Sequence, residues 1–89
     1  MILYHATTPK KARMYHVSGC IKKPVRGFDT VLGAMAWALK VGRNIIYRVE
    51  GEPAYLMPDH HNKDGKAYWI DEDIPLERIR CVRKYKEFI

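Results

Sequence analysis

The sequence predicts a single small α+β domain over residues 1–89, with a mixed β-sheet packed against two helices. A chain of 89 residues has room for one hydrophobic core, and its 47% of apolar residues is enough to form that core. Two segments carry the start and stop signals of helices. Short runs rich in β-branched and aromatic residues surround these segments, which is typical of a sheet covered by helices.

The first half of the chain is expected to begin with a strand over residues 2–6. Thr8 and Pro9 then predict the N-cap and first position of a helix, which ends at Ser18-Gly19 because glycine readily adopts the left-handed conformation. A basic loop over residues 22–28 is expected to lead into a short strand before a second helix over residues 31–41. That helix is expected to be capped by Asp29 or Thr30 and ended by Gly42.

The second helix is apolar around most of its circumference. One stripe recurs at helical spacing and consists of Leu32, Met35, Ala36 and Leu39. Further apolar positions widen this stripe, namely Ala34, Trp37, Ala38 and Val41. The pattern predicts a central buried helix in which Met35 and Trp37 belong to the core and bind no ligand.

The second half is expected to form a strand over residues 44–50, a strand over residues 67–70 and a final strand over residues 78–85. The connection 51–66 is long for so small a domain and contains His60, His61 and an Asp64-Gly65 turn. Such loops are usually functional or mobile. An acidic turn begins at residue 71.

Positive charge is concentrated in the first half of the chain. Residues 1–48 contain nine Lys and Arg against one acid, Asp29, whereas residues 49–89 contain seven against nine. This asymmetry predicts a surface that faces the phosphates of a nucleotide or a nucleic acid. The alternative is that the lysines only solvate exposed faces.

Cysteine usage and the N-terminus indicate a cytoplasmic protein. Cys20 and Cys81 belong to no CxxC motif, and we expect both to be reduced thiols packed as small hydrophobic residues. The N-terminus lacks the pattern of a secretory leader. The longest nearly uncharged stretch, residues 30–39, is too short to cross a bilayer, so no membrane partner is expected.

Several local patterns combine into a family resemblance that covers most of the chain outside residues 51–66. They are Tyr4-His5-Ala6-Thr7 in the first strand, Ser18-Gly19-Cys20-Ile21 after the first helix, Gly27-Phe28-Asp29-Thr30 before the second, and the closing Ile74-Pro75-Leu76-Glu77-Arg78-Ile79. Together they resemble the ADP-ribosyltransferase-like superfamily, which includes diphtheria-type toxins, poly-ADP-ribose polymerases and tRNA 2′-phosphotransferases. The resemblance implies that NAD is the cofactor.

The same resemblance implies roles for five residues. His5 would be the catalytic histidine that bonds the ribose of NAD, with Ala6 and Thr7 beside the nicotinamide amide. Phe28 would stack on the nicotinamide ring, and Arg26 would meet a phosphate. The implied cleft lies between the first strand and the Gly27-Phe28 segment, and it would bind NAD or an ADP-ribose-type nucleotide.

One position departs from the family pattern. Toxins and polymerases of this superfamily have a catalytic glutamate just before the strand that here begins at residue 67, where this chain has Gly65-Lys66. Asp71, Glu72 or Asp73 would replace it only if the acidic turn folds back toward His5. Transfer of ADP-ribose to a protein or nucleic-acid acceptor is therefore one interpretation. The alternative is a catalytically inert basic module that binds nucleic acid or a partner protein.

Two other chemistries are disfavoured by spacing. Asp59-His60-His61 places its histidines on adjacent residues, which point in opposite directions in an extended chain, so no metal site is expected. The histidines of this polar loop are instead expected to be exposed or to touch substrate. Cys20 would act as a nucleophile only in an electropositive pocket, which the sequence does not reveal.

Overall fold

The structure of the chain, a computed structural model, describes residues 1–84. Its helices are α1 (Pro9–Ser18), α2 (Val31–Val41) and the short 3₁₀ turns η1 (Pro58–His60) and η2 (Leu76–Arg78). Its strands are β1 (Ile2–Thr7), β2 (Cys20–Ile21), β3 (Val25–Phe28), β4 (Ile45–Glu50), β5 (Tyr55–Leu56), β6 (Ala67–Ile70), β7 (Ile74–Pro75) and β8 (Ile79–Lys84). The predicted extension of the last strand to residue 85 lies outside the described residues.

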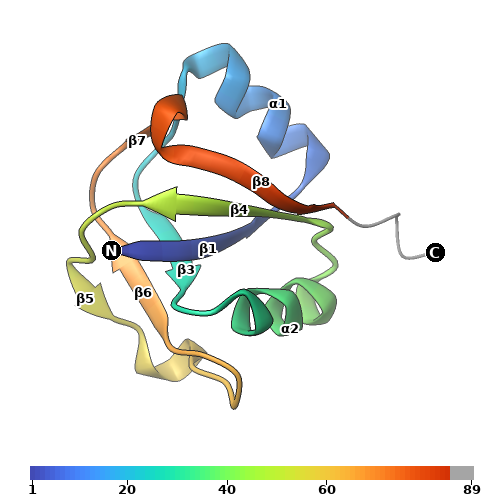
Figure 1. Cartoon of the computed structure of the whole chain (residues 1–89), viewed down its shortest axis with the longest axis vertical. Coiled ribbons are helices and arrows are strands. Elements are labelled where there is room, and N and C mark those ends of the chain that lie inside the picture. The colour runs from blue at the N-terminus through green and yellow to red at the C-terminus, as the bar shows by residue number, and fades with distance from the viewer. Residues whose placement is uncertain (85–89) are drawn as a thin grey trace.

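The main sheet has six strands in the order β5-β6-β3-β1-β4-β8, and β2 pairs separately with β7 (Figure 1). The α+β class is confirmed, but the prediction of a mixed sheet is wrong for residues 1–84, where every pairing between the strands is antiparallel. The reason is the position of β1. Strands β3 and β4 run parallel to one another, joined by α2, but β1 lies between them and opposes both.

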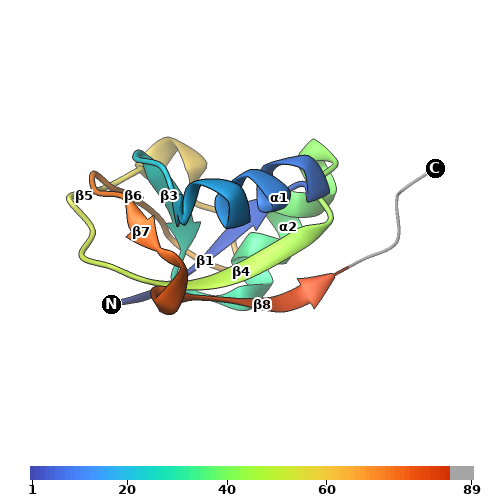
Figure 2. The same ribbon diagram turned by 90° about the horizontal axis from the view of Figure 1, so that it is seen from above.

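The two α-helices pack on opposite faces of the sheet. Because successive side chains of a strand point to opposite faces, β1 contributes to two separate cores. Leu3 packs in one cluster with Ala12 of α1, whereas Ala6 packs in another with Ala34 and Ala38 of α2. Strands β4 and β8 pair side by side, and β8 is the strand at one edge of the sheet (Figure 2).

Helix α2 is a surface helix, and the prediction of a central buried helix is wrong. Ala34 and Ala38 are the buried positions that face the sheet, while Leu32 and Leu39 are 59% and 63% exposed. Small side chains let the helix approach the strands closely, and the described residues place no further layer on its outer side. Trp37 is only half-buried.

The predicted helix ends are confirmed. The Thr8 hydroxyl accepts a hydrogen bond from the backbone N–H of Lys11 at 3.3 Å, and Thr30, rather than Asp29, caps α2 by accepting from the N–H of Gly33 at 3.0 Å. Gly19 and Gly42 both end their helices with positive φ angles of 81° and 73°, as expected for glycine at this position.

The segment 51–66 is ordered by contacts with α2 rather than structureless. Its turn lies at residues 63–64, between the bridge partners Asn62 and Gly65, one residue earlier than predicted. Asn62 Nδ2 donates to the Gly33 carbonyl at 3.2 Å, and Asp29 Oδ1 accepts from the N–H of Lys66 at 2.8 Å. These bonds fix the segment against the start of α2.

Both cysteines are free thiols. Cys20 is half-buried, but Cys81 is exposed on β8, so the expected packing of both as core residues is wrong for Cys81. Neither α1 nor α2, the α-helices of the described chain, is long and apolar enough to span a bilayer.

Gly65 gives a test of the contact between the loop and α2. A Cβ at this position would lie 2.6 Å from Thr30 Oγ1, which caps α2 and also donates to the Asp64 carbonyl. Since Thr30 cannot move without losing the cap, we expect Gly65→Ala to lower the free energy of unfolding by about 1–3 kcal/mol in urea denaturation. In a Thr30→Ala background the same change should cost less, and equal costs in both backgrounds would contradict this account.

Candidate functional site

The main sheet is split between β1 and β3. Within residues 1–84, the only registered residue pair between β1 and β3 is Tyr4↔Phe28. In contrast, all six residues of β1 pair with β4. Beyond Tyr4, the segment His5–Thr7 therefore lacks a β3 partner. Backbone carbonyls that face this gap need other donors, because burying them unpaired is costly.

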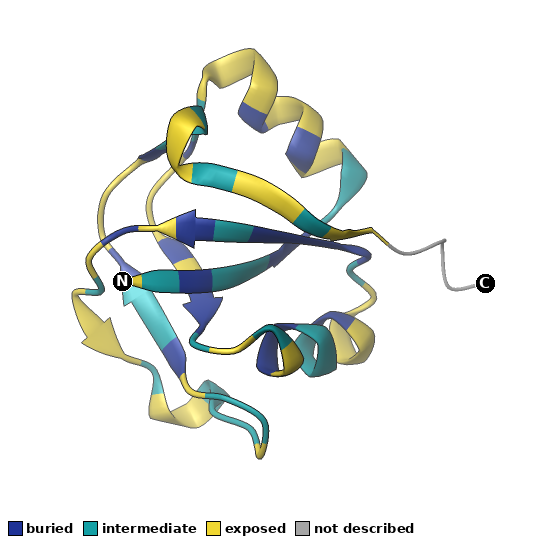
Figure 3. Cartoon of the chain, in the orientation of Figure 1, coloured by how far each residue is buried: buried dark blue, intermediate teal, exposed yellow. Residues whose placement is uncertain are grey.

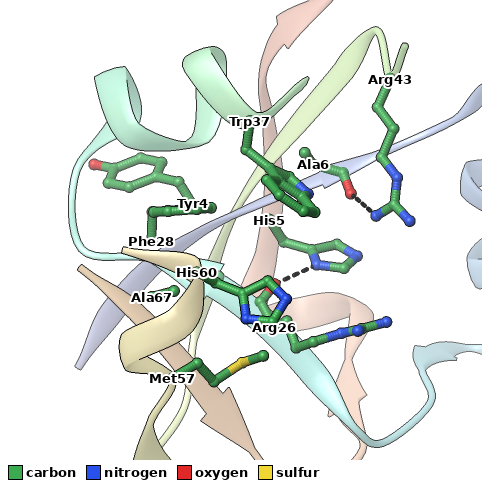
Figure 4. Close-up of a pocket in the computed structure, with 11 residues that line it drawn as sticks. Tyr4, His5, Ala6, Arg26, Phe28, Trp37, Arg43, Met57, His60 and Ala67 are labelled. Atoms are coloured by element: carbon green, nitrogen blue, oxygen red, sulfur yellow. Dashed lines mark hydrogen bonds between the residues drawn. The ribbon is translucent and has the colours of Figure 1, made fainter. Parts of the chain in front are cut away.

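Two side chains supply those donors. His5 Nδ1 lies 2.6 Å from the carbonyl oxygen of Arg26, and Arg43 Nη1 donates to the carbonyl of Ala6 at 2.9 Å (Figure 4). A carbonyl oxygen only accepts, so Nδ1 must carry the proton of the His5 ring. The gap is thus held by one bond from β1 to β3 and one from the end of α2 to β1.

The other His5 nitrogen is held by a short hydrogen-bond chain. Nε2 lies 3.0 Å from the Tyr15 hydroxyl, which in turn lies 2.9 Å from Thr7 Oγ1. With the proton on Nδ1, the neutral ring accepts at Nε2 from Tyr15, and Thr7 then donates to Tyr15. Thr7 itself is fully buried.

This environment keeps His5 neutral. Burial lowers the pKa of His5 from 6.5 to about 4, and the positive charges of Arg43, Lys11 and Arg26 also lower it. The hydrogen bond to the Arg26 carbonyl opposes these effects. Burial also raises the pKa of Tyr15, against the hydrogen bond from Thr7 and the charge of Arg43. Both groups are therefore uncharged at neutral pH.

Two cavities meet at the gap and share three wall residues, His5, Arg26 and Arg43. We call the first the aromatic cavity; it has an open volume of about 460 Å³, and its other walls include Tyr4, Ala6, Phe28, Trp37, Met57, His60 and Ala67. We call the second the cationic cavity; it has about 890 Å³, and its other walls include Lys11, Met14, Tyr15, Cys20, Ile21, Lys22 and Pro24.

The Trp37 ring in the wall of the aromatic cavity contacts two other rings, those of Phe28 and His60. The ring centroids of Trp37 and His60 lie 5.6 Å apart with planes inclined at 68°, and those of Trp37 and Phe28 lie 6.4 Å apart at 42°. Trp37 enters from α2 and His60 from η1, so both point toward His5 across the gap (Figure 4). This enclosure suits a flat ring of a ligand.

The charge of both cavities has one sign. Lys11, Lys22, Arg26 and Arg43 line them, and of the acids in residues 1–84 none forms part of either wall. The acidic turn packs elsewhere, because Asp73 accepts from the Lys23 N–H at 2.8 Å and lies 3.9 Å from Lys22 Nζ. It therefore brings no carboxylate to His5. Cys20 also lines the cationic cavity.

The structure brings four of the five predicted residues to these cavities. His5 and Arg26 line both, Ala6 and Phe28 line the aromatic cavity, and Thr7 lies behind Tyr15 without lining either. Thr7 is thus placed to orient Tyr15 and, through it, His5.

Two wall residues, Arg43 and Trp37, were missed or misassigned from the sequence. No sequence motif marked Arg43. It directly follows Gly42, which ends α2, and its side chain reaches back to β1. Trp37 was expected in the core but lines the aromatic cavity. His60 also lines this cavity, while His61 accepts from the Ala67 N–H at 2.8 Å and holds the loop.

No protein-family model, curated protein or solved structure matches this chain. The resemblance to the ADP-ribosyltransferase-like superfamily therefore rests on the residue patterns alone. Residues 1–84 contain no group of three or more His, Cys, Asp or Glu side chains arranged to hold a metal ion.

The neutral state of His5 predicts a pH dependence of stability. Between pH 6.5 and pH 4 the unfolded chain binds a proton at His5 that the folded chain does not, so stability is lost as pH falls through this range. Between pH 7 and pH 5 this contributes a loss of about 2 kcal/mol.

The matched variant is His5→Asn, whose amide can still donate to the Arg26 carbonyl but does not titrate. Urea unfolding at pH 7 and pH 5 should show a smaller loss for the variant than for the wild type. Equal losses would contradict a His5 that stays neutral in the folded protein.

Proposed function

We propose that the two adjacent cavities bind a nucleotide of the NAD or ADP-ribose class. The observation that carries this proposal is their shared wall, where His5, Arg26 and Arg43 line both an aromatic and a cationic cavity. A dinucleotide combines a flat ring, a ribose and a diphosphate in one chain. The ligand would thus find each of its parts opposite a suitable wall.

The ring of the ligand belongs in the aromatic cavity. Trp37 is half-buried and offers ring surface there, and the His60 ring packs against it. Phe28 is 5% exposed and lies in the core beside Trp37. Aromatic rings favour stacked or edge contacts with flat heterocycles. In this proposal Trp37 takes the stacking role that the resemblance implied for Phe28.

The diphosphate belongs at the junction of the cavities. A guanidinium carries five N–H donors, and the Ala6 carbonyl accepts from Nη1 of Arg43, which leaves further donors for phosphate oxygens. Arg26 faces the same space from β3. Two arginines and the nearby Lys11 then neutralise the two phosphate charges.

The ribose belongs beside His5. Nε2 is a neutral acceptor that now receives the Tyr15 hydroxyl, so a ribose hydroxyl would replace or bridge Tyr15 at this atom. Tyr15 also lines the cationic cavity. The His5 ring would keep the hydrogen bond from Nδ1 to the Arg26 carbonyl, while Nε2 would exchange the Tyr15 hydroxyl for a ribose hydroxyl.

Transfer of ADP-ribose to a protein or nucleic-acid acceptor is the reaction implied by the resemblance. Breaking the bond to nicotinamide develops positive charge on the ribose, which a nearby carboxylate would stabilise. The cavity walls formed by residues 1–84 carry no carboxylate. We therefore propose binding as the primary activity, with transfer dependent on a carboxylate supplied from outside these walls.

A basic module that binds nucleic acid is the second candidate, favoured by the excess of eight positive charges in residues 1–48. Binding of that kind weakens steeply with salt and does not respond to NAD.

Calorimetric titration with NAD and with ADP-ribose tests the proposal. We expect saturable binding to the wild type, and Arg43→Gln should weaken it by about tenfold or more, because a charge-assisted phosphate contact contributes about 1.5–3 kcal/mol. Arg13→Gln is the control, since it makes the same charge change on the exposed side of α1 outside both cavities. Absence of binding, or equal effects of the two variants, would exclude the proposed site.

A further inference from the structure

A row of three side chains crosses strands β3, β6 and β5 on one face of the sheet. Arg26 is registered with Trp69, and Trp69 is registered with Tyr55. Arg26 Cζ lies 6.0 Å from the centre of the Trp69 ring, and the Trp69 and Tyr55 rings stack with centroids 5.5 Å apart and planes 17° from parallel. The guanidinium and the two stacked rings therefore form a continuous row across the three strands.

The stack ends at an open edge. Strand β5 is the last strand of the sheet order in the described chain, so no further strand covers the outer side of Tyr55 (Figure 3). Tyr55 is 55% exposed, and its neighbour Leu56 is 48% exposed. More than half of the Tyr55 surface is therefore open to solvent.

The same row leads directly into the aromatic cavity. Arg26 belongs to both the row and the cavity wall, and Met57 and Ala67, two residues along from Tyr55 and Trp69, also line the cavity. Two sites for a flat ring thus lie on this face, the cavity and the outer side of Tyr55. A guanidinium lies between them.

We propose that this surface binds single-stranded nucleic acid, with one base stacked on Tyr55 and a phosphate further along the same strand at Arg26. The proposal assigns a site and a strandedness to the second candidate function, nucleic-acid binding, and does not depend on nucleotide binding in the cavities. It follows from the combination of exposed aromatic surface and positive charge, which is how proteins bind unpaired bases and their phosphates. Paired bases stack on one another in a duplex, so their faces are not available to Tyr55.

The charge at the Arg26 end of the row favours a polyanion over a peptide. Arg26 continues into the cationic cavity with Arg43, Lys11 and Lys22, and no acid of residues 1–84 lines either cavity. A peptide added to the open edge of β5 would use backbone hydrogen bonds instead, and its affinity would respond little to salt.

The test is fluorescence anisotropy of a labelled ten-nucleotide oligouridine at two salt concentrations. We expect saturable binding that weakens with salt, and Tyr55→Ala should weaken it by about fivefold to a hundredfold, since stacking one base contributes about 1–3 kcal/mol. Tyr55→Phe keeps the ring and should bind as the wild type does. Leu56→Ala removes an equally exposed apolar neighbour and should have no effect.

Absence of saturable binding to the wild type would overturn the proposal, as would equal losses for Tyr55→Ala and Leu56→Ala. Urea unfolding of each variant shows whether a loss reflects unfolding. Tyr55→Ala should leave the affinity for ADP-ribose unchanged. Failure of ADP-ribose to bind the wild type would therefore count against the cavity site alone and leave the oligonucleotide result intact.

Discussion

The opening of the sheet between β1 and β3 is the constraint on which the rest of the site depends. Strand pairing stops at Tyr4↔Phe28, and the carbonyls of Ala6 and Arg26 are instead satisfied by side chains. Using His5 and Arg43 for this purpose has a chemical consequence. A neutral imidazole and a guanidinium are fixed in the interior of a small sheet, at a position that a continuous strand ladder would have closed.

The two faces of the sheet support this opening from different sides. On one face, Tyr15 of α1 fixes the second nitrogen of His5, with Thr7 buried behind it. On the other face, α2 contributes Trp37, and the turn after α2 contributes Arg43. The loop 51–66 completes the wall with His60 because Asn62 and Gly65 hold it against the start of α2. Helix packing and site geometry are therefore coupled.

Local signals predicted the elements well and the packing less well. Caps such as Thr8 and Gly42 made the helix ends predictable, because their side-chain and backbone preferences act within a few residues. The exposure of Leu32 and Leu39 was not predictable from apolar periodicity, since periodicity does not reveal whether a second layer covers the outer side of a helix. The antiparallel sheet depended on where β1 inserts, which is a long-range choice.

The predictions for the site residues show the same difference between local signals and long-range contacts. His5, Arg26 and Phe28, which were expected to line a cleft between the first strand and the Gly27-Phe28 segment, line the cavities, and their nucleotide binding stays a prediction. Arg43 escaped notice because its role comes from a bond to a strand 37 residues away, with no motif to mark it. The absence of a carboxylate at Gly65-Lys66 was visible in the sequence. Only the packing of Asp73 against Lys22 and Lys23 showed that the acidic turn does not replace it.

The most direct test of the central claim is an amide-resolved NMR titration of the protein with ADP-ribose. The account predicts saturable shifts concentrated on both sides of the opening, at His5, Arg26, Phe28 and Arg43, with little change along β8. Shifts that never saturate, or that follow exposed lysines away from the opening, would contradict the claim that the split in this sheet is a nucleotide site.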